Sequence, residues 1–369
     1  MIRIAYVIPT LDQSGAERQL TLLATSLPRD EYDIRVIALQ RGGPYLKVLQ
    51  DAGIDVRVLG KRFRFDLLTW FRLRQELRGF QPHIVQSFLF AANSYVRLPG
   101  VTPSATKVVV SERCVDSWKS GWQLNLDRRQ IPRTHALTAN SNSVADFYGG
   151  VGVPRDLITV IPNALPKAVS SYSKSQAREI LGLKEEHRVV GFVGRLAPQK
   201  RLQDVVWALQ LLHQLVDNAR LVLIGDGPER DALSDLATSF GCRDRIIFAG
   251  HREDAAALMT AFDAFVLGSE FEGMSNSLME AMSIGLPCIV SDIAPNRELI
   301  IDDVTGLLFP VGKSPDLAKL CAKVLTDADL ANRLGEAARK HVATQHTLEK
   351  TVAAHEDLYQ RLTGLRPSR

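Results

Sequence analysis

Short apolar runs rich in valine and isoleucine alternate with longer segments of helical periodicity, and this alternation constrains the fold more than any other feature of the chain. Strands that are apolar on both faces are typical of parallel sheets, because helices cover both sides of such sheets. The runs are residues 2–8, 34–39, 56–59, 84–86 and 107–110 in the first half, and 189–193, 221–224, 246–248, 264–267 and 288–290 in the second. The sequence therefore predicts an α/β protein with two doubly wound parallel sheets.

The length of the chain and one break in its pattern predict two domains. A single hydrophobic core stops growing at about 250–300 residues, and this chain has 369 residues, 46% of them hydrophobic. The segment IPNALPKAVSSYSKSQ, residues 161–176, interrupts the periodicity with prolines and serines. We therefore expect one domain over residues 1–165 and a second over residues 166–345.

The composition argues against several classes of protein. The net charge of +4, from 45 basic and 41 acidic residues, is too small an excess for a nucleic-acid-binding surface. The four cysteines show neither zinc-site spacing nor the pattern of a small disulfide-rich domain. No run approaches ~18 apolar residues and the N-terminus lacks a signal-peptide pattern. We therefore expect a cytoplasmic protein with no nucleic-acid partner.

The loops that leave the strands are the candidate functional segments, because ligands of open parallel sheets bind beyond the carboxyl ends of the strands. In VVGFVGRLAPQKR the strand at 189–193 runs into Gly194, Arg195 and Lys200. Arginine offers a planar fork of donors and lysine a point charge, and together they suit the oxygens of a diphosphate. Taken alone, the loop fits an ordinary solvated loop better, so its neighbours have to decide.

The segment GSEFEGMSNSLMEAMSIGLPCIVSD, which follows the strand at 264–267, is the most informative one. Glu272 in the loop and Glu280 in the next helix lie eight positions apart and direct two carboxylates toward one pocket. Backbone N–H groups at a helix N-terminus attract phosphate, and here they belong to Gly273, Met274, Ser275, Asn276 and Ser277. The alternative is that Ser277 and Glu280 form a capping box and that Glu272 is solvated. Spacing alone leaves both open.

Four motifs of the second half resemble those of the group 1 (family four) retaining GT-B glycosyltransferases: VGRLAPQK, IGDGPER, SEFEGMSNSLMEAMSIGLP and DDVTGLLFP. The resemblance covers nearly the whole chain, since SGAERQL is similar to the family's glycine loop and IPNAL to its interdomain segment. It implies two Rossmann-like domains facing a central cleft, with the acceptor on the N-terminal side and the donor on the C-terminal side. It also implies that the C-terminal segment 346–369, with a helix near 348–362, crosses back to the first domain.

The resemblance further implies retaining transfer of a sugar from a nucleotide-diphosphate donor, UDP-linked by default, to a carbohydrate or lipid-linked acceptor. Arg195 and Lys200 would bind the diphosphate and stabilise the departing charge, and Glu280 would bind the ribose. Glu272 would lie beside the transferred sugar, while the amides of residues 273–277 and the loop at Gly15 hold sugar and phosphate. We expect no metal or other cofactor, because the two cations supply the positive charge and no Asp-x-Asp loop follows a strand.

One position departs from the family pattern. Members often carry a His-x-His pair after the strand at 84–86, whereas this chain has Gln86 and Phe88, neither of which titrates. Whether this replacement alters or abolishes transfer stays open. Two alternative functions follow, namely another GT-B activity such as that of a sugar-nucleotide epimerase, and a nucleotide-sugar binding protein without transfer.

Other polar residues beside strand ends also have two interpretations. His83 and His135 are more typical of structural histidines than of catalytic ones. Glu112 and Arg113 in VVVSERC either line the acceptor side or form an ion pair in a loop.

A basic and aromatic segment, KRFRFDLLTWFRLRQELR at residues 61–78, carries six basic and two acidic residues. Such a segment can lie on an anionic membrane surface, where a lipid-linked acceptor resides. The alternative, which we favour at this stage, is an amphipathic crossover helix in which Leu67, Trp70 and Phe71 pack on the sheet while the arginines face water.

Overall fold

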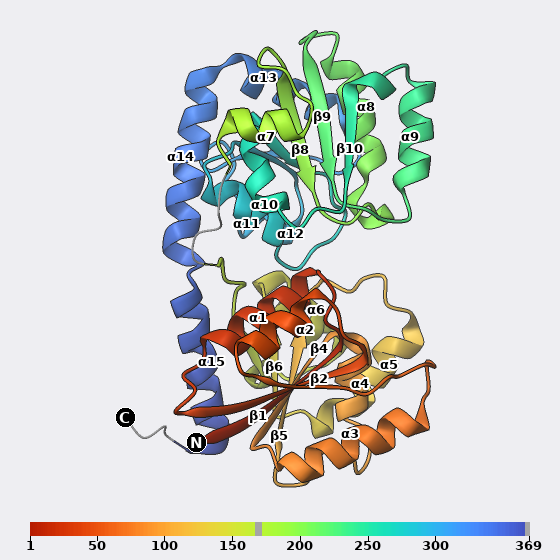
Figure 1. Ribbon diagram of the computed structural model, residues 1–369, viewed down its shortest axis with the longest axis vertical. Helices are drawn as coiled ribbons and strands as arrows, with labels where there is room; N and C mark the ends of the chain where they lie inside the picture. The colour runs from red at the N-terminus through yellow and green to blue at the C-terminus, as the bar shows by residue number, and fades with distance from the viewer. Residues whose placement is uncertain (167–171, 366–369) are drawn as a thin grey trace. The chain divides into compact units, whose positions relative to one another are not determined.

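The computed structural model of the chain describes residues 1–166 and 172–365 and contains two compact units, each built around one sheet (Figure 1). Unit 1 comprises Met1–Ala164 and Leu348–Arg369, and unit 2 comprises Leu165–Thr347. The expected boundaries after residues 165 and 345 differ from these by one and two residues. Part of the expected linker, residues 167–171, lies outside the described residues.

Unit 1 holds a seven-stranded parallel sheet in the order β3-β2-β1-β4-β5-β6-β7. Its strands are β1 (Ile2–Thr10), β2 (Tyr32–Arg41), β3 (Asp55–Val58), β4 (Ile84–Phe88), β5 (Lys107–Glu112), β6 (Ala136–Ala139) and β7 (Ile158–Val160). The helices between them are α1 (Gly15–Ser26), α2 (Pro44–Asp51), α3 (Leu67–Phe80), α4 (Leu89–Val96), α5 (Gly121–Gln130) and α6 (Asn142–Val151). The strand order changes direction between β1 and β4, which makes that position the switch point of this sheet.

Unit 2 holds a six-stranded parallel sheet in the order β10-β9-β8-β11-β12-β13. Its strands are β8 (Arg188–Val193), β9 (Ala219–Ile224), β10 (Ile246–Gly250), β11 (Ala264–Leu267), β12 (Cys288–Ser291) and β13 (Leu307–Phe309). Its helices are α7 (Lys174–Ile180), α8 (Leu202–Leu212), α9 (Arg230–Ser239), α10 (Ala255–Leu258), α11 (Asn276–Ser283), α12 (Ala294–Arg297), α13 (Ser314–Thr326) and α14 (Ala328–Gln345). The switch point lies between β8 and β11.

The prediction of two doubly wound parallel sheets is confirmed, and each of the ten predicted runs overlaps a strand. In β1, Ile4, Tyr6 and Ile8 enter one hydrophobic cluster while Ala5 and Val7 enter another. The unbroken apolar run therefore reflects a strand that is covered on both faces.

The last helix, α15 (Leu348–Thr363), belongs to unit 1 although it follows unit 2 in the chain (Figure 1). Its buried Leu358 and Tyr359 join the cluster of β1 side chains. The Tyr359 hydroxyl lies 2.9 Å from the Tyr6 hydroxyl, and Thr351 Oγ1 donates to the Pro162 carbonyl at 3.1 Å. Unit 1 is therefore assembled from the two ends of the chain.

Acid is expected to loosen this helix through His355, which is 4% exposed. Burial lowers the pKa of His355 from 6.5 to about 4 because the interior disfavours the charged ring. Between these values the unfolded chain binds a proton that the folded chain does not, so stability falls as the pH drops from 6.5 toward 4. The full loss is about 3 kcal/mol.

The measurement is urea unfolding of wild type and His355→Leu at a series of pH values, followed by far-UV circular dichroism. The difference in unfolding free energy between the two proteins isolates this histidine from every other titrating group. We expect that difference to change in favour of the variant as the pH falls. A difference that is constant with pH would contradict the assignment.

The outward face of α3 corrects one of the sequence interpretations. The buried residues of α3 are Thr69, Leu73 and Leu77, which are spaced by four and form one stripe. Leu67 and Phe71 lie on the other side and are 85% and 57% exposed. The interpretation that these two side chains pack on the sheet is therefore wrong.

None of the described helices has both the length and the apolar character that crossing a membrane requires.

Candidate functional site

The two loops that the sequence marks as functional follow neighbouring strands. β8 and β11 pair directly, although β9 and β10 separate them in the chain, and they flank the switch point of the second sheet. Helices leave such a pair of strands toward opposite faces, and ligands of doubly wound sheets bind at that position. The topology of unit 2 therefore places both predicted loops at its ligand-binding edge.

Direct contacts fasten these two loops to each other. The Glu270 amide donates to the Gln199 carbonyl at 2.9 Å, and Gln199 Nε2 donates to the Phe271 carbonyl at 2.7 Å. Lys200 ends the short 3-10 turn Pro198–Lys200, and its Nζ contacts the Glu272 carboxylate. The structure thus brings together the predicted cation of one loop and the predicted carboxylate of the other.

The Glu272 carboxylate is largely buried and is bound by neighbouring side chains. Its side chain is 9% exposed and that of Lys200 is 16% exposed. The Ser269 hydroxyl also donates to Glu272 Oε1 at 2.6 Å. Charges in such a poorly solvated site act on a ligand more strongly than the same charges in water. The solvated alternative for Glu272 is therefore wrong.

Arg195 lies on the same loop but is exposed, and its side chain makes no hydrogen bond or ion pair with the part of the chain that the structure describes. Its backbone neighbours are fixed, because the Gly194 amide donates to Ile224 and the Leu196 amide to Asp226, both at 3.0 Å. The guanidinium is thus carried on a rigid support while remaining available to a ligand.

Glycines of the IGDGPER motif allow this support to form. A Cβ at Gly225 would lie 1.9 Å from the Gly194 carbonyl oxygen, and one at Gly227 would lie 2.3 Å from the Leu196 carbonyl oxygen. Only glycine permits so close an approach of two backbones. The sequence analysis used this motif only as part of the resemblance to the family. The two glycines in it could also have indicated that two backbone segments approach closely here.

The helix that follows the Glu272 loop starts at a different residue from the one considered. Ser275 is the N-cap of α11 and accepts from the Leu278 amide at 3.3 Å. Ser277 lies inside the helix, so the capping box of Ser277 with Glu280 is wrong. Glu280 lies in the second turn and is 9% exposed. The predicted donor segment thus forms the N-terminus of α11, where the remaining predicted members are Gly273, Met274 and Asn276.

Gly15 lies in unit 1, as the first residue of α1 and just beyond the carboxyl end of β1. Sequence reasoning missed its neighbour Glu17, which is 3% exposed. Glu17 accepts from Thr10 Oγ1 at 3.1 Å and also from Ser14 Oγ. Burial raises the pKa of Glu17. The carboxylate joins both ends of the glycine loop and fixes its path.

Gln86 and Phe88, the residues that replace the family's histidine pair, are structural here. Gln86 is fully buried, donates from Nε2 to Ser111 Oγ at 2.8 Å and accepts from the Tyr359 hydroxyl. Phe88 is 2% exposed and packs edge-on against Tyr6, with ring centroids 6.1 Å apart. Both side chains therefore serve the packing of unit 1.

The two histidines that precede strands also have structural partners. His83 Nδ1 accepts from the Arg3 amide at 2.9 Å, and His135 Nδ1 accepts from the Val108 amide at 3.1 Å. Each lies directly before a strand, at the amino edge of the sheet and away from the carboxyl edge where ligands bind. The structural interpretation of both histidines agrees with these contacts.

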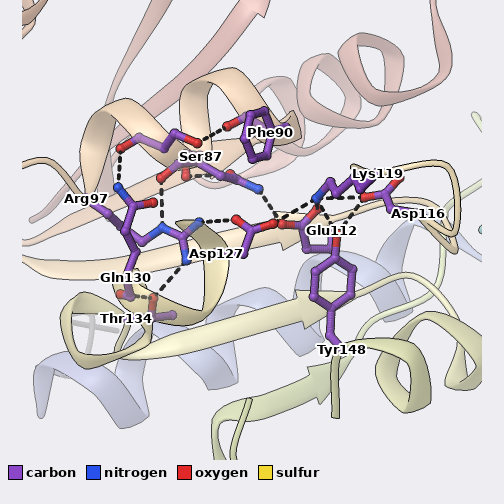
Figure 2. A network of polar contacts seen from close by, with 12 residues as sticks. Ser87, Phe90, Arg97, Glu112, Asp116, Lys119, Asp127, Gln130, Thr134 and Tyr148 are labelled. Carbon is purple, nitrogen blue, oxygen red and sulfur yellow. Dashed lines mark hydrogen bonds and ion pairs between the residues drawn. The ribbon is translucent and has the colours of Figure 1, made fainter. Parts of the chain in front are cut away.

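Glu112, the last residue of β5, belongs to a buried polar network that sequence reasoning missed (Figure 2). Asn93 Nδ2 donates to Glu112 at 2.9 Å, and Lys119 Nζ lies 3.7 Å from its other oxygen. Lys119 Nζ also lies 3.0 Å from Asp116 and 3.1 Å from Asp127. Arg113 instead donates to Asn163. The interpretation of Glu112 and Arg113 as a loop ion pair is therefore wrong.

Charge in this network is closely balanced. With every group ionised, Glu112, Asp116 and Asp127 face Lys119 and also Arg97, which lies 2.8 Å from Asp127. Burial raises the pKa of Glu112 to about 7, and a protonated Glu112 removes the excess negative charge. The carboxylates raise the pKa of Lys119 although burial opposes them. The network joins α4, β5, α5, α6 and the loop between β5 and α5 (Figure 2).

Two family models match most of the chain. A model described as "Glycosyl transferases group 1" matches residues 173–341, and one described as "Glycosyltransferase Family 4" matches residues 13–167. The first lies within unit 2 and contains the loops of Lys200 and Glu272. The second contains the glycine loop and most of unit 1.

Characterised relatives align over part of the chain. N-acetyl-alpha-D-glucosaminyl L-malate synthase of Bacillus anthracis is 32% identical over 64% of this chain and 62% of its own length. UDP-Gal:alpha-D-GlcNAc-diphosphoundecaprenol alpha-1,3-galactosyltransferase of Escherichia coli is 33% identical over 55% of this chain and 54% of its own length. The matches thus span less than two thirds of these relatives.

Solved structures share the whole architecture. HepE of Anabaena, solved in complex with UDP-glucose, has a TM-score of 0.86 at 22% identity, with 99% of this chain and 100% of that chain covered. The expected GT-B fold is thereby confirmed.

Proposed function

Because this chain belongs to the group 1 glycosyltransferases, we propose that it moves a sugar from a UDP-sugar to a carbohydrate or lipid-linked acceptor. The names of two relatives bear on the substrates, and the second of them supports this choice. One is a glucosaminyl L-malate synthase, and the other takes galactose from UDP-Gal to a diphosphoundecaprenol-linked sugar. The second name supports both the uridine donor and the lipid-linked class of acceptor.

The observation that carries the proposal is the contact of Lys200 with Glu272 at the switch point of unit 2. A cation and a carboxylate side by side match two adjacent parts of a nucleotide sugar. The diphosphate needs positive charge, and the sugar hydroxyls need an acceptor. In this proposal Lys200 and Arg195 bind the diphosphate, and Glu272 accepts a hydroxyl of the transferred sugar.

The helix α11 completes the proposed donor site. The amides of residues 273–277 surround its N-terminus, where the positive end of the helix dipole favours anionic groups. Glu280, one turn further on, would accept the ribose hydroxyls, and Gly15 would support sugar and phosphate from unit 1. Acceleration would come from positioning and from charges fixed in advance against the leaving diphosphate.

The proposed chemistry is retaining and metal-independent. Arg195 and Lys200 can neutralise the leaving diphosphate without a divalent ion. Retention follows from the family's reaction on one face of the sugar, in which the leaving phosphate takes the acceptor proton. Phe88 in place of a histidine is compatible with that route, since no side-chain base is needed.

We further propose that the protein works in the cytoplasm, as a peripheral protein on the inner face of the membrane.

The test is incubation of the purified protein with a panel of labelled nucleotide sugars, with and without acceptor and with EDTA. Acceptor-dependent release of UDP in the presence of EDTA supports the proposal, and NMR of the product gives the anomeric configuration. An altered sugar still attached to nucleotide would indicate epimerisation. Binding without either product would indicate a protein that does not transfer.

UDP alone is expected to stabilise unit 2. A ligand at about 100 times its Kd adds about 2.7 kcal/mol, which raises the Tm of a domain of this size by roughly 5–10 °C. UMP, which lacks the second phosphate, should give a much smaller shift. Differential scanning fluorimetry checks both, and Arg195→Ala should reduce the UDP shift without changing the Tm of the free protein. Equal shifts for UDP and UMP would contradict a diphosphate site.

A further inference from the structure

An exposed apolar patch lies at the start of α3 and in the loop before it. It comprises Phe63, Phe65, Leu67, Leu68 and Phe71, which are 70%, 79%, 85%, 54% and 57% exposed. Single exposed apolar residues are common on protein surfaces, but a cluster of large ones within one short segment marks an interaction surface. We call these five residues the α3 patch.

Basic residues share the segment of the α3 patch and lie before, within and after it in the sequence. The segment 61–78 holds Lys61, Arg62, Arg64, Arg72, Arg74 and Arg78 against Asp66 and Glu76, a local net charge of +4. Both acidic groups are already engaged inside unit 1. Asp66 caps α3 by accepting from the amides of Leu68 and Thr69, and Glu76 lies 3.1 Å from Arg35. The charge that the segment presents to solvent is therefore positive.

Aromatic contacts extend the α3 patch onto α5. The Arg64 guanidinium lies over the Trp122 ring, 4.4 Å from its centroid. Trp122 is 42% exposed and packs edge-on against Phe90, with centroids 5.7 Å apart. These contacts fix the loop before α3 against α5, so the apolar side chains stay outside the core in a defined arrangement.

The α3 patch lies on the ligand-binding side of unit 1. All strands of that sheet are parallel, so their carboxyl ends share one edge. The loop before α3 leaves the carboxyl end of β3, and the loops with Gly15 and Arg113 leave the same ends of β1 and β5. In Figure 1, α3 runs along the margin of unit 1.

We propose that the α3 patch docks unit 1 on a bilayer that contains anionic phospholipids. Aromatic and leucine side chains insert at the boundary of headgroups and acyl chains, while the surrounding arginines bind the lipid phosphates. Charge complementarity selects this partner, because the patch combines exposed apolar side chains with a positive rim. The docking site stands independently of the reaction, but its benefit rests on the proposed function, since it brings the carboxyl edge of unit 1 to a lipid-linked acceptor.

The experiment is flotation of the full-length protein with vesicles of phosphatidylcholine alone or mixed in equal parts with phosphatidylglycerol, without donor or acceptor. Wild type is expected to float with the mixed vesicles and to release as salt rises. Phe63→Ser/Phe65→Ser/Phe71→Ser should lower the partition coefficient tenfold or more. Arg62→Gln/Arg78→Gln should lower it about 30-fold, and these two side chains bond to no other described residue.

Two control variants carry the same numbers of apolar or basic substitutions at exposed positions outside the α3 patch. Leu215→Ser/Ile301→Ser/Val304→Ser alters three exposed apolar residues of unit 2 and should leave binding unchanged. Arg155→Gln/Lys184→Gln removes two exposed cations outside the α3 patch and should also leave vesicle binding unchanged. Thermal unfolding shows that each variant folds.

Three results would overturn the proposal: wild type that does not bind the mixed vesicles, a triple serine variant that binds like wild type, or wild type that dimerises through the α3 patch instead. Sedimentation velocity tests the last of these. Transfer to a water-soluble acceptor analogue is measured separately for each variant. Loss of vesicle binding with transfer intact is the expected result for the patch variants. Absence of transfer in every protein, wild type included, would count against the proposed function and not against the docking surface.

Discussion

Lys200→Ala is expected to lower the rate of sugar transfer about 100- to 1,000-fold, the usual loss when one group that stabilises developing charge is removed. Lys200 is only 16% exposed and contacts Glu272, so its charge acts in a poorly solvated site. In the proposed reaction the diphosphate gains negative charge as the sugar leaves, and the ammonium would stabilise that state more than the ground state. The effect should appear mainly in kcat, measured as acceptor-dependent UDP release.

Controls separate this role from a structural one. Lys184→Ala removes an exposed lysine of the same unit and should be neutral. Lys200→Arg keeps the charge and should restore part of the activity, whereas Glu272→Ala should also reduce transfer strongly. Lys200→Ala leaves the poorly solvated Glu272 carboxylate without its cation, so its Tm should fall, and transfer is measured at a temperature at which thermal unfolding shows the variant to be folded. Wild-type kcat in Lys200→Ala would discredit the assignment of the site.

Lys119→Met is expected to destabilise unit 1 by about 3–5 kcal/mol, as when one member of a buried ion network is removed. The Lys119 side chain is 1% exposed, and three carboxylates lie within 3.7 Å of its Nζ. Its Nζ also donates to the Tyr148 hydroxyl at 2.6 Å. Methionine fills the space but leaves buried negative charge that only Arg97 opposes.

Urea unfolding of the variant checks this value. Lys47→Met, at an exposed site on α2, is the control and should be close to neutral. Adding Glu112→Gln to Lys119→Met should recover part of the loss, because it removes one of the carboxylates left unpaired. UDP binding should persist in every variant that retains folded unit 2, so stability and donor binding can be separated. An unchanged urea midpoint in Lys119→Met would show that the network contributes little.

The sheets could be predicted because most of their strands are short runs of consecutive apolar residues, which can be recognised in the sequence alone. Where a strand is covered on both faces its residues are apolar without interruption, as residues 4–8 of β1 and the whole of β11 show. The three missed strands give a weaker signal because they have only three or four residues each. β7 and β13 have three residues each at the edges of their sheets, and β6 reads ALTA. Their pairing depends on neighbours from distant parts of the chain, which no window of sequence contains.

The candidate donor site could be predicted to the level of its loops, and the reason is topological. Once β8 and β11 are taken as strands of a doubly wound sheet, the loops of Lys200 and Glu272 meet at one edge. What could not be predicted is side-chain placement. The burial of Glu272 depends on Ser269 and Lys200, and the start of α11 at Ser275 rather than Ser277 depends on backbone geometry.

The buried network of unit 1 left almost no trace in the sequence. Its members come from α4, β5, α5, α6 and the loop between β5 and α5, and each is an ordinary polar residue in its own segment (Figure 2). No spacing rule joins Asn93, Lys119 and Tyr148, because the fold alone brings them together. Likewise the exposure of Leu67 and Phe71 was missed because apolar residues at helical spacing usually face a core.

The packing of α15 into unit 1 dictates an order for synthesis on the ribosome. Residues 165–347 form one continuous stretch, so unit 2 has all its parts as soon as that stretch leaves the exit tunnel. Unit 1 has to wait for the last helix, and until then Tyr6, Gln86 and the apolar cluster around them lack the cover of Leu358 and Tyr359. The half of the protein that is made first is therefore the half that is finished last, and a ribosome that stalls before Leu348 leaves a nascent chain with an open hydrophobic surface for chaperones to bind.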